Sequence, residues 1–339
     1  LLSKIALKTL GVSAISEAMI APNELMCLSS HIPSSILCLM ATNEVLAVDL
    51  GQSGCRIKQG DSLVVSDRGK LVGEAPLNSL RSVFESLTPM SADVVALSCT
   101  GFNGTVAEPD SFGSLCKEFF GATKVAVIDD GFAGFVGALN GRNGVVLSIG
   151  GGVVSVGGRD GKFAHRDGLG STFGDEGGGF WLGKLAITKA LGIRQGRGDD
   201  SEMLDYFAQE CQAFDALQVK NNAEAATLAI RTAQKVLEAA DAGVSTATAI
   251  VDEGAYLLAQ TVVATWYGCG GAKSDSPEIV IQGGPARNAS YSTKIALEIN
   301  AKLPNAVIVQ SSGDNLDGAT WIAENMRQDA PPLLLWAAL

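Results

Sequence analysis

Residues 45–57 read VLAVDLGQSGCRI, which predicts an apolar strand, a tight glycine-rich turn and a second strand. The same arrangement returns at residues 145–156, which read VVLSIGGGVVSV. Glycine adopts positive φ angles readily and has no Cβ, so the backbone N–H groups of such turns can approach an anion closely. Two hairpins of this kind could hold one polyphosphate from opposite sides. The sequence therefore predicts an ATP-handling protein built on a duplicated unit.

Length and composition favour a two-lobed globular protein. The chain has 339 residues, more than one ordinary domain, and its 40 glycines fall in short clusters after apolar strands. A net charge of −11 without a cluster of Lys and Arg argues against a nucleic-acid surface. The seven cysteines form no C-x-x-C pair, so we expect reduced thiols. No apolar run reaches the ~20 residues of a membrane helix, and we expect a cytoplasmic protein without a membrane partner.

The pattern of apolar residues divides the chain into five parts. Residues 1–44 precede the first strand and show little pattern, so we expect a leader or extension outside the core. Residues 45–142 predict an N-terminal lobe with a mixed five-stranded sheet, and residues 143–314 predict a second lobe on the same plan with a helical insertion. A closing helix is expected over residues 315–326, and an off-pattern tail outside the core over residues 327–339.

The first glycine turn carries Asp49 at the end of its strand. A carboxylate in this position can hold Mg²⁺, directly or through water, against the phosphates of a nucleotide. If this hairpin were the only one, we would interpret Asp49 as a solvated carboxylate in an ordinary turn. Because a second hairpin of the same kind follows, a phosphate-binding site is the favoured interpretation. The candidate phosphate-binding residues of the two turns are Gly51, Gln52, Ser53, Gly54, Gly150, Gly151 and Gly152.

Asp130 follows a predicted strand and precedes a predicted helix start. A carboxylate there can accept the hydroxyl proton of an acceptor that attacks a γ-phosphoryl group. The alternative is a helix N-cap, which is common for Asp. Asp129 competes for the role of base, and the residues alone favour Asp130 without excluding its neighbour.

Residues 166–183 read RDGLGSTFGDEGGGFWLG. This run resembles the signature of the N-acetylglucosamine kinases and related BadF/BadG-type ATPases of the actin-like sugar kinase superfamily, and the order of elements matches from about Val45 to Met326. The resemblance implies an α/β, two-lobed actin-like (ribonuclease H-like) fold with duplicated mixed five-stranded sheets. It also implies ATP and Mg²⁺ as cofactors, a nucleotide in the cleft between the lobes, and a homodimer such as many relatives form.

The same resemblance assigns roles to single residues. Asp130 falls on the catalytic Asp of the family, and Asp49 begins the first phosphate motif. In the second phosphate motif, Gly151 and Gly152 replace hydroxyl-bearing residues, which leaves only backbone N–H contacts there. The family's adenosine-side motif falls on Gly283 and Gly284.

For the sugar, the resemblance points to the G-D-E-G run. Asp175 is expected to bind sugar hydroxyls together with Glu176, and Gly168 and Asp130 are expected beside them. Two carboxylates after a glycine suit vicinal hydroxyls, which donate hydrogen bonds to them. Leu169 stands where kinases specific for N-acetylglucosamine often have Trp. The expected reaction is ATP-dependent phosphorylation of an amino sugar, N-acetylglucosamine or glucosamine, to its 6-phosphate.

Two other functions stay open at this point. The first is an ATPase that activates a 2-hydroxyacyl-CoA dehydratase through an iron–sulfur cluster, for which the cysteines lack the expected glycine-rich context. The second is a nucleotide or sugar sensor without catalytic activity. The presence of Asp49, Asp130 and Asp175 argues against a sensor, because a sensor needs no catalytic base.

Overall fold

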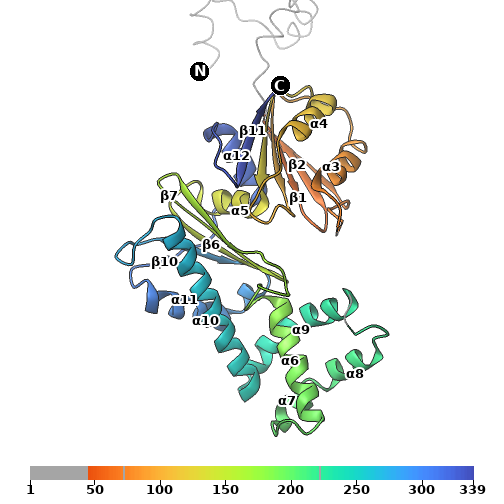
Figure 1. Ribbon diagram of the computed structural model, residues 1–339, viewed down its shortest axis with the longest axis vertical. Coiled ribbons are helices and arrows are strands. Elements are labelled where there is room, and N and C mark those ends of the chain that lie inside the picture. The colour runs from red at the N-terminus through yellow and green to blue at the C-terminus, as the bar shows by residue number, and fades with distance from the viewer. Residues whose placement is uncertain (1–44, 72, 221–222) are drawn as a thin grey trace, which may run out of the picture. The chain divides into compact units, whose positions relative to one another are not determined.

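Two mixed β-sheets form the centre of the described structure (Figure 1). The computed structural model describes residues 45–339 apart from residues 72, 221 and 222, and these residues belong to one structural unit. The strands of the first sheet are β1 (Val45–Leu50), β2 (Cys55–Gln59), β3 (Ser62–Ser66), β4 (Val94–Cys99), β5 (Lys124–Asp129) and β11 (Leu334–Ala338).

The spatial order of this first sheet is β11-β5-β4-β1-β2-β3. Strands β4 and β5 run parallel to β1, whereas β2, β3 and β11 each pair antiparallel with their neighbours. Strands β1, β4 and β5 read as nearly continuous apolar runs because both faces of the sheet are covered there. Helices α3 (Pro76–Phe84) and α4 (Asp110–Phe120) cover one face through residues such as Leu80 and Leu115. The first sheet and these helices are the N-terminal lobe.

The second sheet repeats this plan. Its strands have the order β10-β9-β6-β7-β8, with β6, β7 and β8 antiparallel and with β9 and β10 parallel to β6. Helices α10 (Ser245–Gly268) and α11 (Ala289–Lys302) pack on it and contribute to its hydrophobic core. The strands are β6 (Gly144–Ile149), β7 (Val153–Arg159), β8 (Lys162–Asp167), β9 (Glu278–Gln282) and β10 (Val307–Ile308), and a short helix, η3 (Pro285–Arg287), follows β9.

Two helices join the sheets. Helices α5 (Asp130–Leu139) and α12 (Asn315–Asn325) lie in a core that takes residues from both sheets, among them Ala126 and Val146. The two helices approach so closely that a Cβ on Gly137 would lie 2.0 Å from the carbonyl oxygen of Asp314. Any larger side chain at this position would push α5 and α12 apart, so glycine is needed for the close packing of the two helices that connect the lobes.

Four helices are inserted after β8. They are the segment predicted as a helical insertion in the second lobe, and they lie together at one end of it (Figure 1). Two of these helices meet at the buried Phe207. The four helices are α6 (Gly179–Arg194), α7 (Ser201–Tyr206), α8 (Ala208–Ala216) and α9 (Ala223–Asp241).

The predicted two-lobed α/β class with duplicated mixed sheets is confirmed, with two corrections in the N-terminal lobe. The first sheet has six strands rather than five, and residues 327–339 are part of the core rather than a tail outside it. Strand β11 pairs with β5 from Leu334 opposite Ile128, and Leu333 and Leu334 are buried. The predicted leader, residues 1–44, lies outside the described residues. Within the described chain, no helix combines the length and apolarity that a membrane crossing requires.

Candidate active site

A cavity of about 500 Å³ brings together residues from both lobes. It lies where the carboxyl end of β5 and the loop after β4 face the glycine turn between β6 and β7. The sequence-predicted residues that line this cavity are Gln52, Asp130, Gly150, Gly152, Gly168 and Asp175.

The two adjacent acids at the end of β5 have different surroundings. Asp129 is the N-cap of α5, and one carboxylate oxygen accepts a hydrogen bond from the N–H of Phe132 at 3.3 Å. Its other oxygen accepts one from the N–H of Gly104 at 2.9 Å, and the residue is 1% exposed. Asp130, the first residue of α5, accepts a hydrogen bond from the N–H of Gly131 at 3.0 Å. The N-cap role that the sequence leaves open for Asp130 therefore belongs to Asp129.

The electrostatic surroundings of Asp130 suit a general base. Burial, together with the negative charges of Asp129 and Asp49, raises the pKa of Asp130 to about 6. Hydrogen bonds from Thr100 and from the N–H of Gly131 oppose this rise in pKa. A carboxylate with a pKa near 6 is still mostly ionised at neutral pH but binds a proton more readily than an ordinary carboxylate does.

Asp175 is held in place by backbone contacts. One carboxylate oxygen accepts a hydrogen bond from the N–H of Val153 at 2.8 Å, and the N–H of Asp175 donates to Asp167 at 2.9 Å. Burial raises the pKa of Asp175 above its ordinary value. A Cβ on Gly152 would lie 2.7 Å from this carboxylate, so the absence of a side chain at Gly152 makes room for it. Asp175 lines the cavity, and among the described residues no donor pairs with its second carboxylate oxygen.

Glu176 does not share this environment. Its side chain is exposed, and it is absent from the lining of the cavity. The predicted pair of sugar-binding acids is therefore divided, with only Asp175 at the cavity.

Asp49 is paired with a cation within its own lobe. Its carboxylate accepts hydrogen bonds from the guanidinium of Arg56 at 2.6 and 3.2 Å and from the hydroxyl of Ser98 at 3.2 Å. Arg56 also contacts Asp314, the N-cap of α12, at 2.6 Å. Asp49 does not line the cavity. Arg56 thus balances the charge of Asp49, and a metal ion bound directly to this carboxylate would have to compete with Arg56.

The two glycine turns close in the same way. The N–H of Gly51 donates to the carbonyl of Gly54 at 2.9 Å, and the N–H of Gly150 donates to that of Gly152 at 2.8 Å. These two N–H groups stabilise the turns and are not directed at a ligand. The duplicated hairpins predicted from the sequence are thus alike in their hydrogen bonding, and phosphate contacts would come from the neighbouring N–H groups.

A second cavity of about 380 Å³ adjoins the first through Gly150, which lines both. Its lining includes the predicted residues Gly151 and Gly284 and the apolar side chains of Ile230 and Leu237. Gly283 is exposed and does not line this cavity; it packs closely on the preceding glycine turn, because a Cβ on it would lie 2.0 Å from the carbonyl oxygen of Ile149. The predicted residues that line neither cavity are Asp49, Gly51, Ser53, Gly54, Glu176 and Gly283.

Besides Ser148 near the end of β6, four polar residues line the first cavity without having been predicted as site residues. They stand on loops or near element ends with no sequence motif of their own, and only the tertiary fold brings them to the cavity. His165, which lies within β8, has its Nε2 3.9 Å from a carboxylate oxygen of the buried Asp129, and burial lowers the pKa of His165. The four residues are Thr100, Asn103, His165 and Asn315.

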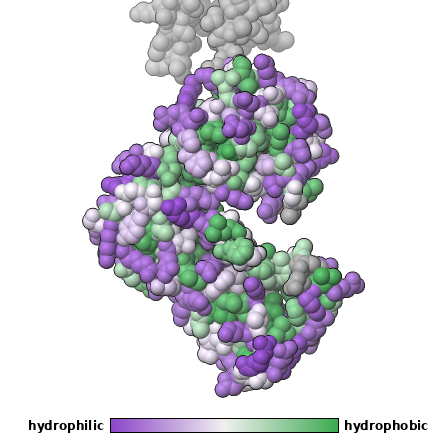
Figure 2. All heavy atoms as spheres, in the orientation of Figure 1, coloured by the Kyte–Doolittle hydropathy of each residue, from purple (hydrophilic) through white to green (hydrophobic). Residues whose placement is uncertain are grey.

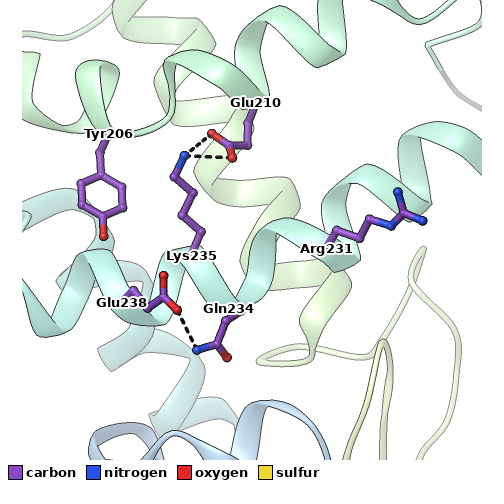
Figure 3. Close-up of a pocket in the computed structure, with 6 residues that line it drawn as sticks. All are labelled: Tyr206, Glu210, Arg231, Gln234, Lys235 and Glu238. Atoms are coloured by element: carbon purple, nitrogen blue, oxygen red, sulfur yellow. Dashed lines mark hydrogen bonds and ion pairs between the residues drawn. The ribbon is translucent and has the colours of Figure 1, made fainter.

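Another groove, on the helical insertion, has a different character (Figure 3). Lys235 donates to both oxygens of Glu210 at 2.8 and 2.9 Å, and Gln234 donates to Glu238 at 3.0 Å. Its polar groups are thus largely paired with one another, whereas Asp130 and Asp175 face open space. The two cavities around the glycine turns are the stronger candidate site.

Solved structures share the fold of this chain. A protein from Chromobacterium violaceum, provisionally assigned as an N-acetylglucosamine kinase, is 19% identical, with a TM-score of 0.59 over 82% of this chain and 97% of its own. A protein from Porphyromonas gingivalis with the same provisional assignment is 14% identical, with a TM-score of 0.56 over 83% and 99%. A ROK family glucokinase from Streptomyces griseus, in complex with glucose and AMPPNP, is 13% identical, with a TM-score of 0.51 over 83% and 99%.

At these identities the similarity establishes the fold. No curated protein sequence matches the chain. A family model does match, over residues 60–323, which include most of both lobes and the whole helical insertion. The chain belongs to the BadF/BadG/BcrA/BcrD ATPase family.

Proposed function

We propose that the protein is an ATP-dependent kinase that phosphorylates a hydroxyl group of an amino sugar, N-acetylglucosamine or glucosamine, at the 6-position. The ATPase family and the fold shared with sugar kinases support a kinase-like ATPase. The choice of an amino sugar rests on the resemblance of residues 166–183 to the N-acetylglucosamine kinases and on the provisional assignments of two similar structures.

One observation carries the proposal. Asp130 and Asp175 line a single cavity, and that cavity adjoins a second one through the glycine turn at Gly150. An acceptor in the first cavity and an adenosine group in the second would place the phosphate chain over this turn. Backbone N–H groups beside the turn can then hold the phosphates, as glycine-rich turns do.

Each side chain then has a defined task. The carboxylate of Asp175, oriented by the N–H of Val153, accepts hydrogen bonds from sugar hydroxyls. The oxygen of the sugar hydroxyl attacks the γ-phosphorus, and the bond between that phosphorus and ADP breaks. Asp130 accepts the proton that the hydroxyl loses in this step. The raised pKa of Asp130 favours this proton transfer near neutral pH.

Mg²⁺ is the ion expected to accompany ATP, and it would offset negative charge on the phosphates. The residue predicted to hold it, Asp49, is bound by Arg56 in the described structure. The described residues contain no group of three or more His, Cys, Asp or Glu side chains that could hold a metal ion. Because Mg²⁺ is usually held by phosphates and water with only one or two carboxylates, a contact of the ion with Asp49 through water stays a prediction.

The alternative of an ATPase activator has little support from the cysteines. An iron–sulfur cluster shared by two subunits needs thiolates at the surface, because the cluster must reach both chains. Among the described residues, the free cysteines are all buried, and burial raises the pKa of each thiol above its ordinary value. They are Cys55, Cys99, Cys116, Cys211 and Cys269.

A coupled ADP-release assay with Mg-ATP tests the proposal. The sugars to compare are N-acetylglucosamine, glucosamine, N-acetylmannosamine, N-acetylmuramic acid and glucose, with Asp130→Asn as the control variant. We expect release that depends on an amino sugar and is lost in the variant. Release without any sugar would indicate an ATPase switch, and release with none of the sugars would contradict the proposal.

A further inference from the structure

The helical insertion contains a cavity of about 610 Å³ that shares no lining residue with the two site cavities. Residues from α6, α8 and α9 line it, together with Ser171 and Thr172 from the loop before α6. This volume is in the range of cavities that hold small organic ligands. Apolar residues reach the surface in this part of the molecule (Figure 2).

The charges around this cavity are all of one sign. Lys184, Arg197 and Lys220 line it, and no Asp or Glu does. None of these three cations forms a salt bridge with an acidic side chain of the described chain. Asp215, whose pKa Lys220 helps to lower, is bound through both oxygens by Arg194. In a protein with 36 acidic and 25 basic residues, a cavity lined by cations alone indicates an anionic ligand.

The rest of the lining is largely apolar. The side chains of Phe180, Leu191 and Phe214 contribute to it. The ammonium group of Lys184 lies 5.8 Å from the ring centre of Phe180, and that of Lys220 lies 4.6 Å from the ring centre of Phe214. Each of these ammonium groups is therefore next to an aromatic face rather than opposite a carboxylate. Lys220 also donates hydrogen bonds to the backbone carbonyls of Phe214 and Asp215, and Arg197 donates to the side chain of Gln195, so these two cations have neutral partners only. The cavity combines a cationic part with an aromatic part.

We propose that this cavity is a second ligand site, which binds an organic phosphate with an aromatic or apolar body. The cations would contact the phosphate, the hydroxyls of Ser171 and Thr172 can donate further hydrogen bonds to it, and the phenyl rings would cover the body of the ligand. The loop that carries these hydroxyls also carries Gly168 and Asp175 of the candidate active site. A ligand in the second site would therefore contact the same loop that carries Asp175 at the candidate active site.

The test uses 1-naphthyl phosphate as the probe and measures its binding to the full-length protein by calorimetry. The double variant Lys184→Gln/Arg197→Gln removes two cations, and we expect it to weaken binding about tenfold or more. The matched control is Lys189→Gln, an exposed lysine of the same helix that does not line the cavity. This control should bind the probe as the unmodified protein does.

A further variant approaches the site from α9. Ala226→Glu places a carboxylate at the cavity on a partly exposed helical position, so it should fold and still repel the phosphate. Equal affinity in the unmodified protein, the double variant and the control would overturn the proposal. Binding of 1-naphthol as tight as that of the phosphate ester would also overturn it, as would binding of inorganic phosphate as tight as that of the ester. The measurement needs no kinase activity, so its outcome is independent of the function proposed above.

Discussion

Asp129 and Asp130 are adjacent in the chain, yet only the carboxylate of Asp130 is left for a ligand. Asp129 caps α5 and holds the N–H of Gly104, and it is almost fully buried. Asp130 lines the cavity, where its carboxylate accepts hydrogen bonds from the N–H of Gly131 and the hydroxyl of Thr100. Asp129 therefore has a structural role at the start of α5, whereas the carboxylate of Asp130 is accessible to a ligand in the cavity.

Asp130→Asn should reduce turnover by about a thousandfold while leaving ATP binding within about twofold, because removing a general base costs a factor of 10²–10⁴. In the unmodified protein, kcat/KM should rise with pH through about 6, since the base acts only when it is ionised. Steady-state kinetics between pH 4.5 and 8 and nucleotide titrations check both points. A rate independent of pH across this range would contradict the assignment.

Asp129→Asn tests the coupling between the two acids. The variant removes a negative charge that raises the pKa of Asp130, so the acidic limb of the pH profile should move to lower pH. Asparagine is itself a good helix N-cap, so α5 should still begin at the same place. The midpoint of the kcat/KM profile is the quantity to compare, and an unchanged midpoint would contradict the coupling.

The raised pKa of Asp130 also predicts an effect on stability. The folded protein binds this proton up to about pH 6 and the unfolded chain only up to about 3.8, so stability falls as pH rises between these values. Above pH 6 the ionised carboxylate costs up to about 3 kcal/mol. Asp130→Asn should thus be more stable than the unmodified protein at pH 8, and the difference should vanish near pH 3.5. Urea unfolding at the two pH values measures it.

Asp175→Asn and Glu176→Gln remove one charge each from neighbouring positions. We expect the first variant to raise KM for the sugar about tenfold or more, because its carboxylate faces the cavity. Asparagine also tolerates the positive φ of 61° at this position. The second variant should change KM less than twofold, since Glu176 is exposed and outside the cavity. Equal increases of KM in the two variants would contradict this division and indicate that Glu176 also contacts the sugar.

Arg56→Gln should destabilise the protein by about 1–3 kcal/mol, because it leaves the buried carboxylate of Asp49 without its cation. Asp314→Asn breaks the second contact of Arg56, but the side chain of Asp314 is 52% exposed. Its loss should cost less than about 1 kcal/mol. Chemical denaturation of both variants checks the difference, and a larger loss for Asp314→Asn would contradict it.

The sequence predicted site residues best where the pattern lies within a single strand and the turn that follows it. The glycine turns, the strand before Asp129 and the G-D-E-G run are local patterns, and they led to Asp130, Gly152 and Asp175. The role of Asp49 could not be read in the same way, since Arg56 is seven residues away and binds it only because β1 and β2 pair. Asn315 is farther still, and only the packing of α12 on α5 brings it to the cavity.

The edge strand β11 has a consequence for how this protein is made. Residues 334–338 complete the sheet that begins at Val45, and they pair with β5, which is synthesised some 200 residues earlier. During translation, one hydrogen-bonding edge of β5 therefore stays exposed until β11 has left the ribosome. Synthesis of the N-terminal lobe therefore begins before that of the second lobe and is completed after it, and the open edge of β5 is the place where a nascent chain of this protein would be prone to aggregation.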